Sequence, residues 1–144
     1  MRTSDNRLSK AAGASPGPDR NALTENPFIL VVEDDPTLRL VWQKVLLRAG
    51  FEVAVAEDGL DAFEAIRRRI PDLLVLDLGL PRMRGEVLLR ELRRAPAHRA
   101  IPVIVVTGQP DAPELPVEAT LHKPFSTQAL LEAVKSCLDE RPRR

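Results

Sequence analysis

The amino-acid sequence predicts an α/β fold in which helices cover both faces of a five-stranded parallel sheet. Short apolar runs such as "FILVV" (28–32), "DLLVLD" (72–77) and "IPVIVV" (101–106) alternate along the chain with amphipathic segments of helical period. Strands that are apolar on both faces are typical of parallel sheets buried between two helical layers. The alternation of strand and helix patterns therefore predicts a doubly wound architecture.

Five strand patterns and four helix patterns account for most of the chain after residue 27. The expected strands are residues 28–32, 51–57, 72–77, 101–108 and 117–125. The expected helices are residues 35–50, 59–69, 85–95 and 126–140. The first helix has the clearest ends, because Asp35 can cap its amino terminus, Pro36 suits its first turn and Gly50 can end it.

Apolar residues at helical spacing predict which side of each helix packs on the sheet. Trp42 lies on the apolar stripe of the first helix and is expected in the core. In the second helix, the spacing predicts that Leu60, Phe63 and Ile66 point inward.

The segment between the fourth and fifth strands interrupts the alternation. Residues 109–116, "QPDAPELP", contain Pro110, Pro113 and Pro116 where a helix would be expected. Proline removes a backbone donor and clashes with the preceding helical turn, so three prolines at this density exclude a regular helix. We expect this helix to be shortened or replaced by a loop.

Composition bounds the class of protein and its partners. Lys+Arg and Asp+Glu are both 21, so the net charge is zero, which argues against nucleic acid as the main partner. The single cysteine, Cys137, excludes an internal disulfide framework. No apolar run approaches the ~20 residues that span a bilayer, and no secretory signal precedes the first strand. We therefore expect no membrane insertion and a cytoplasmic location.

The same patterns divide the chain into three parts. Residues 1–26 are rich in small, polar and charged residues and predict a flexible N-terminal arm. Residues 27–140 carry all the strand and helix patterns and predict one folded domain. Residues 141–144, "RPRR", read as a basic tail.

Chemically capable side chains follow the strands at their carboxyl ends, where doubly wound sheets bind ligands. Acids follow the first and third strands, a hydroxyl ends the fourth, and a lysine follows the fifth. In chain order these residues are Glu33, Asp34, Asp35, Asp77, Thr107 and Lys123.

This combination of groups predicts a phosphoryl-transfer site. Crowded carboxylates resist ionisation unless a cation lies between them, and Mg²⁺ prefers oxygen ligands of this kind. One carboxylate could attack phosphorus and form an acyl phosphate, while the metal, the lysine and the hydroxyl would stabilise the transferred oxygens. We expect Asp35 to cap the first helix rather than to bind the metal.

Four segments resemble, in order, the motifs of the receiver (CheY-like) domain of two-component response regulators. They are "ILVVEDDP" (29–36), "PDLLVLDLGLPRMRG" (71–85), "IPVIVVTG" (101–108) and "LHKPF" (121–125). The resemblance covers roughly residues 28–138, about three-quarters of the chain. It implies a flavodoxin-like sheet with strand order 2-1-3-4-5, Mg²⁺ as the cofactor, and residues 27–140 as the receiver domain.

The resemblance also implies a role for each matched position. Asp77 would be the phosphoacceptor, with Thr107 as the switch hydroxyl and Lys123 as its cationic partner. The metal ligands would be Glu33, Asp34, Asp77 and the backbone carbonyl of Gly79. The peptide bond between Lys123 and Pro124 would be cis.

Two departures from the family pattern concern how a signal would leave the site. Thr120 occupies the position, three residues before the lysine, where the family usually has an aromatic switch residue. The connection from Thr107 to Lys123 is also too short for a full helix, as in receivers with a degenerate fourth helix. We expect reordering of residues 109–116 to relay the signal instead.

The leading interpretation is a stand-alone receiver that takes a phosphoryl group from a histidine kinase or a histidine phosphotransfer protein. It would signal by altered contacts with an unknown downstream protein, because residues 141–144 are too few to form an output domain. The alternative is that the chain is a piece of something larger. Such a protein would catalyse only its own phosphorylation and dephosphorylation, and so would not be a true enzyme.

Three other functions compete with this interpretation. A pseudo-receiver would bind partners without phosphorylation, which Thr120 and the lost helix keep open. A Mg²⁺-dependent aspartyl-phosphate phosphatase would need a general acid two residues after the nucleophile, where this chain has Gly79. A flavin-binding protein is disfavoured, since the acids at residues 33–35 would repel the cofactor phosphate.

Overall fold

The computed structural model describes residues 26–140, and the predicted arm up to residue 25 and the predicted tail, 141–144, lie outside them. Five parallel strands form one sheet in the order β3-β2-β4-β5-β6, which confirms the predicted order 2-1-3-4-5. The strands are β2 (Phe28–Val32), β3 (Glu52–Ala56), β4 (Leu73–Asp77), β5 (Val103–Thr107) and β6 (Ala119–His122).

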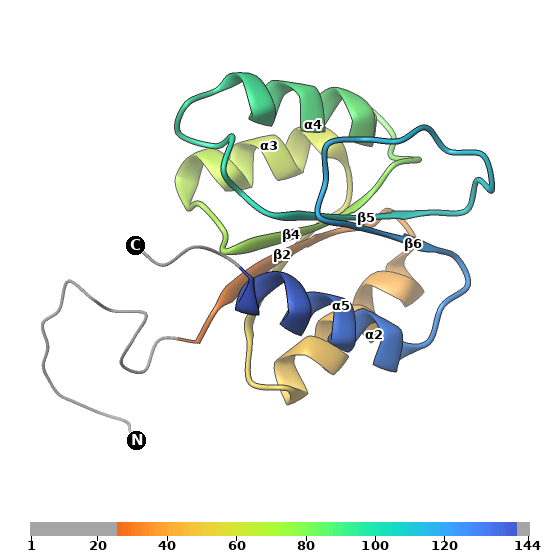
Figure 1. Ribbon diagram of the computed structural model, residues 1–144. Helices are drawn as coiled ribbons and strands as arrows, with labels where there is room; N and C mark the ends of the chain where they lie inside the picture. The colour runs from red at the N-terminus through yellow and green to blue at the C-terminus, as the bar shows by residue number, and fades with distance from the viewer. Residues whose placement is uncertain (1–25, 141–144) are drawn as a thin grey trace, which may run out of the picture.

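Four helices cover the sheet in two layers, with α3 and α4 on one face and α2 and α5 on the other (Figure 1). They are α2 (Pro36–Arg48), α3 (Gly59–Arg68), α4 (Gly85–Arg94) and α5 (Thr127–Asp139). Among residues 26–140, no helix combines the length and the apolar composition that crossing a bilayer requires.

Two hydrophobic clusters hold these layers together, because successive side chains of a strand point to opposite faces of the sheet. Leu30 and Leu74 belong to the cluster beneath α3 and α4. Their neighbours Ile29 and Leu73 belong to the cluster beneath α2 and α5, which also contains Trp42. β2, β4 and β5 are buried along their whole length, which explains their continuous apolar sequences.

The prediction that Leu60 points inward is wrong. Leu60 is 38% exposed, and the buried residues of α3 include Ala62 and Ile66. Residues two apart on a helix lie on nearly opposite sides, so a helix that packs through Ala62 must turn Leu60 outward. Phe63 is partly buried against the cluster, as predicted.

The chain between β5 and β6 forms no helix, as its prolines predict. Three of its apolar side chains, Ala112, Leu115 and Val117, pack against the cluster beneath α3 and α4. Arg93 of α4 donates hydrogen bonds from Nε and Nη2 to the carbonyl of Pro116, at 3.2 and 3.0 Å. The segment is therefore anchored to α4 close to the start of β6.

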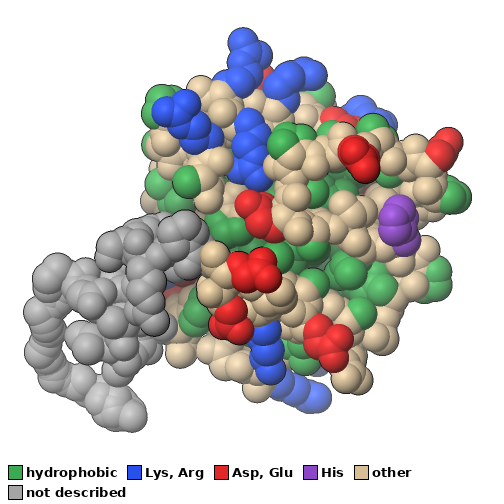
Figure 2. Space-filling model, in the orientation of Figure 1, with side chains coloured by type: hydrophobic (Ala, Val, Ile, Leu, Met, Phe, Trp, Pro, Cys, Tyr) green, Lys and Arg blue, Asp and Glu red, His purple; other side chains and the backbone are tan. Residues whose placement is uncertain are grey.

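Basic residues are concentrated on the α3–α4 layer (Figure 2). α3 and α4 each have two arginines in the last turn, where positive charge is favoured by the helix dipole. The helices of this fold run against the strands, so these arginines lie at the end of the sheet opposite the acids that follow β2 and β4. These arginines therefore do not neutralise the acids that follow β2 and β4.

Gly85 allows α4 to begin directly against the end of β4. A Cβ at Gly85 would lie 2.5 Å from the carbonyl oxygen of Asp77 and 2.8 Å from the Cα of Leu78. Since both neighbours are backbone, we expect Gly85→Ala to lower the free energy of unfolding by about 1–3 kcal/mol in urea denaturation. Gly108→Ala is the control, because nothing lies within 4 Å of its Cβ position. Equal losses in the two variants would contradict this packing argument.

Candidate functional site

The acids after β2 divide into one buried residue, one exposed residue and a helix cap. Glu33 is only 1% exposed, and its Oε2 accepts a hydrogen bond of 3.0 Å from the N–H of Asp35. Asp34 is exposed. Asp35 caps α2, because its Oδ1 accepts from the N–H groups of Thr37 and Leu38 at 2.8 and 3.2 Å. The prediction that Asp35 caps this helix is therefore confirmed.

Asp77 is the last residue of β4 and is 5% exposed. Its Oδ1 accepts a hydrogen bond of 3.2 Å from the N–H of Gly79, which places the Gly79 backbone beside the carboxylate. Carboxylate oxygens of Glu33, Asp34 and Asp77 all lie within 4.8 Å of one another. The fold thus brings together three acids from two strands.

Lys123 joins the two buried acids. Its Nζ donates to Glu33 Oε1 at 2.9 Å and lies 3.3 Å from Asp77 Oδ2. The Lys123–Pro124 peptide bond is cis, as the resemblance implied. The ammonium group also lies 5.7 Å from the centre of the Trp42 ring, and that ring stacks on Phe125 at 5.3 Å. The lysine is therefore held between acids at its tip and an aromatic pair beside it.

Burial and neighbouring charges shift the pKa values of both Glu33 and Lys123. Burial is the main reason that the pKa of Glu33 is raised to about 7; the Asp77 charge adds to the rise, and the Asp35 N–H and Lys123 oppose it. Burial lowers the pKa of Lys123, but the hydrogen bond to Glu33 and the two carboxylate charges outweigh it, so that pKa is raised overall. One ammonium group thus only partly offsets the negative charge of the site.

This donor set fits a magnesium ion. Mg²⁺ binds oxygen ligands, usually one or two carboxylates together with water and phosphate oxygens. Asp34 is exposed and Asp77 and Glu33 are buried beside it, so the cluster offers carboxylates that open to solvent on one side.

Thr107 ends β5 on the strand next to Asp77. It is 2% exposed, and Asp77 pairs in the sheet with the residue before it, Val106. Its hydroxyl oxygen accepts a hydrogen bond of 3.1 Å from the N–H of Gln109. The hydroxyl is therefore linked to the first residue of the segment that replaces the missing helix. Thr120, the substitute for the aromatic residue, is exposed on β6.

Sequence reasoning missed Arg39, whose side chain contacts the backbone of the acids that follow β2. Its Nη1 donates to the backbone carbonyl of Glu33 at 3.0 Å and lies 3.5 Å from that of Asp34. The available signal was its position four residues after the Asp35 cap, which places it on the first turns of α2 facing back toward the acids.

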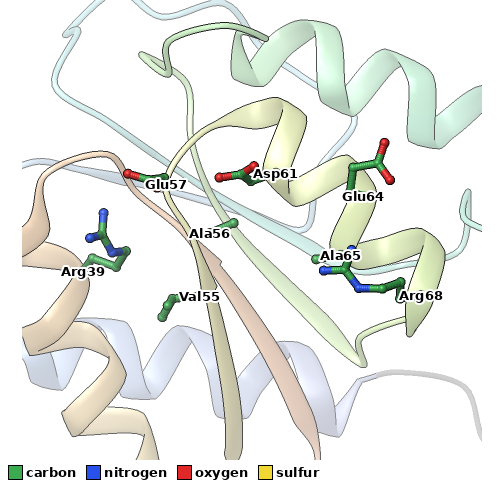
Figure 3. Close-up of a pocket in the computed structure, with 8 residues that line it drawn as sticks. All are labelled: Arg39, Val55, Ala56, Glu57, Asp61, Glu64, Ala65 and Arg68. Carbon is green, nitrogen blue, oxygen red and sulfur yellow. The ribbon is translucent and has the colours of Figure 1, made fainter.

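Arg39 also lines a pocket of about 470 Å³ between α2 and α3, at the edge formed by β3 (Figure 3). The other charged residues of this pocket are Glu57, Asp61, Glu64 and Arg68. None of the three clustered acids lines it, so this pocket is separate from the acidic cluster.

Comparison with known proteins gives a consistent result. Residues 29–135 match the family described as the response regulator receiver domain. The chain is 33% identical over 116 residues to the chemotaxis protein CheY of Bacillus subtilis, and the match covers 77% of this chain and 97% of CheY. It is 36% identical over 116 residues to the DNA-binding response regulator MtrA of Mycolicibacterium smegmatis, covering 76% of this chain and 50% of MtrA. The chain thus spans about half the length of that relative.

A solved structure with a similar fold contains a metal ion. The receiver domain of a sensor histidine kinase from Pseudomonas aeruginosa is similar with a TM-score of 0.75 and 26% sequence identity, over 80% of this chain and 99% of that one. Its structure holds a magnesium ion coordinated in the active-site cleft. Sequence match, fold and acidic cluster agree, and the chain belongs to the response regulator receiver family of two-component systems.

Proposed function

We propose that Asp77 accepts a phosphoryl group from a phosphohistidine of a histidine kinase or a histidine phosphotransfer protein. The observation that supports this most strongly is the contact of Lys123 with both Glu33 and Asp77, at the point where three carboxylates converge. We assign Glu33, Asp34, Asp77 and the carbonyl of Gly79 as the residues that would hold Mg²⁺.

The proposed reaction transfers one phosphoryl group between two proteins. A carboxylate oxygen of Asp77 attacks phosphorus, the phosphorus–nitrogen bond of the donor breaks, and the released imidazole takes a proton from solvent. Lys123 and the hydroxyl of Thr107 donate hydrogen bonds to the phosphoryl oxygens. A bound Mg²⁺ supplies positive charge that stabilises those oxygens during transfer. The protein would catalyse only this reaction and the hydrolysis of its own acyl phosphate.

We infer that the signal leaves through the segment that follows Thr107. Rotation of the Thr107 side chain toward a phosphoryl oxygen would move the hydroxyl oxygen that accepts the hydrogen bond from the N–H of Gln109, and so would shift the start of this segment. Arg93 holds the far end of the segment at Pro116, so the change would be concentrated in residues 109–115. Altered contacts of this surface with an unknown downstream protein would carry the output. A cytoplasmic location stays a prediction from the sequence.

Asp77→Asn tests the phosphoacceptor assignment. Incubation with acetyl phosphate and Mg²⁺ should add one phosphoryl group to the parent protein, seen by intact mass spectrometry, and none to this variant. Asp35→Asn is the matched control, because asparagine can still cap α2 and should leave the adduct intact. Absence of an adduct on the parent under these conditions would support the pseudo-receiver.

Lys123→Gln tests the role of the ammonium group. Removing one preorganised donor to the phosphoryl oxygens should slow adduct formation by roughly 100-fold at saturating Mg²⁺, measured by mass spectrometry over time. Mg²⁺ should bind at least as tightly as in the parent, because a competing cation has been removed from Glu33 and Asp77. Lys135→Gln, on the exposed side of α5, serves as the control. A parental rate in Lys123→Gln would remove Lys123 from the mechanism.

A further inference from the structure

Arg82, in the loop between β4 and α4, has a backbone conformation that side chains disfavour. Its φ is 64°, and it is the one non-glycine residue with positive φ among residues 26–140. In this region a Cβ crowds the following carbonyl, so glycine is the residue that adopts it without penalty. An arginine therefore occupies a position where glycine would be less strained. The contacts of its side chain are the place to look for the reason.

The guanidinium group of Arg82 binds two acids at the start of α3. Nε donates to Asp58 Oδ2 at 2.8 Å, and Nη2 donates to Asp58 Oδ1 at 3.2 Å and to Asp61 Oδ1 at 3.0 Å. Asp58 is buried and also caps α3 through the N–H of Asp61. A bidentate pair of this kind fixes the direction as well as the distance of its partners. The hydrogen bond from Arg82 is the main reason that the pKa of Asp58 is lowered.

A second contact in the same place joins the loop to α3. The carbonyl oxygen of Met83 lies 2.0 Å from where a Cβ would be on Gly59, the first residue of α3. The loop backbone therefore rests on the α3 terminus, and Arg82 holds it there. At its base the loop is closed by a hydrogen bond of 3.1 Å from the N–H of Gly85 to the carbonyl of Leu78.

Stability alone does not explain this arrangement. The Arg82 side chain is 53% exposed although the Asp58 side chain is only 9% exposed, and the solvent at Arg82 weakens what the ion pair contributes to the free energy of folding. The strain at φ 64° acts against folding and offsets part of that gain. The arrangement instead fixes the loop that leaves Asp77 and passes through Gly79, whose N–H contacts the Asp77 carboxylate.

We propose that Arg82 is a positioning residue for the phosphorylation site. Bound to Asp58 and Asp61, it holds the loop so that the backbone of Gly79 stays beside Asp77 before Mg²⁺ or a phosphodonor arrives. This inference rests on the proposed function, and it adds α3, through its first turn (Asp61 in Figure 3), to the elements that shape the site.

Mg²⁺ affinity is the readout that separates positioning from a structural role. MgCl₂ is titrated at constant ionic strength into the full chain, following Trp42 emission and, as a second readout, calorimetry. We expect Arg82→Ala and Arg82→Gly each to bind Mg²⁺ roughly 10-fold more weakly than the parent. Arg82→Gly also relieves the backbone strain, so it should unfold at no lower a temperature than Arg82→Ala.

Two matched variants complete the test. Arg84→Ala removes a similarly exposed arginine of the same loop, paired with Glu86 at 3.5 Å, and should bind Mg²⁺ like the parent. Asp58→Asn keeps a cap for α3 but loses the charge, so it should weaken Mg²⁺ binding, and combining it with Arg82→Ala should cause no further loss. Arg82→Ala and Arg82→Gly proteins that bind Mg²⁺ as tightly as Arg84→Ala would overturn the inference.

The parent protein separates failure of this inference from failure of the proposed function. A parent that binds Mg²⁺ but gains no phosphoryl group from acetyl phosphate contradicts the proposed function, while the ratio of affinities still decides the role of Arg82. A parent that binds no Mg²⁺ overturns both. If the parent gains the phosphoryl group but binds Mg²⁺ no more tightly than the Arg82 variants do, only the positioning role is overturned.

Discussion

The contact of the Lys123 ammonium group with Glu33 and Asp77 is the interaction on which the site depends. It joins residues 90 and 46 positions apart in the chain and so fixes the ends of β2, β4 and β6 relative to one another. Glu33 and Asp77 are buried, and buried carboxylates are costly unless they are paired and hydrogen-bonded. The fold supplies that pairing at the carboxyl end of the sheet, where the residues that end or follow β2, β4 and β6 meet.

Lys123 neutralises only part of the negative charge of the site, and the remaining negative charge favours binding of a cation. One ammonium group faces three carboxylates, and Glu33 keeps a pKa raised to about 7 mainly by burial. A divalent cation would complete the neutralisation and leave Asp77 able to act as a nucleophile. Two arginines outside the cluster fix the segments around it. Arg39 donates to the backbone of the acids after β2, and Arg82 connects the loop after β4 to the start of α3. Rigid support of this kind keeps the acids close despite their repulsion.

The strands, the helices and the lost fourth helix could be predicted because each depends on local pattern: continuous apolar runs, helical spacing and three prolines. The convergence of Glu33, Asp34, Asp77 and Lys123 followed from parallel strands ending at one edge. Leu60 was misplaced because helix spacing alone does not say whether Ala62 or a larger residue faces the sheet. Arg39 and Arg82 were missed because their partners are backbone carbonyls and a distant helix cap, and the positive φ of Arg82 has no sequence signal when the residue is not glycine.

Anomalous diffraction from crystals soaked in Mn²⁺, an oxygen-preferring substitute for Mg²⁺, tests the central claim most directly. The account predicts a peak among Glu33, Asp34, Asp77 and the carbonyl of Gly79, with Lys123 still in contact with a buried carboxylate. A peak only among Glu57, Asp61 and Glu64 in the pocket beside α3, or no peak at the ends of β2 and β4, would contradict it.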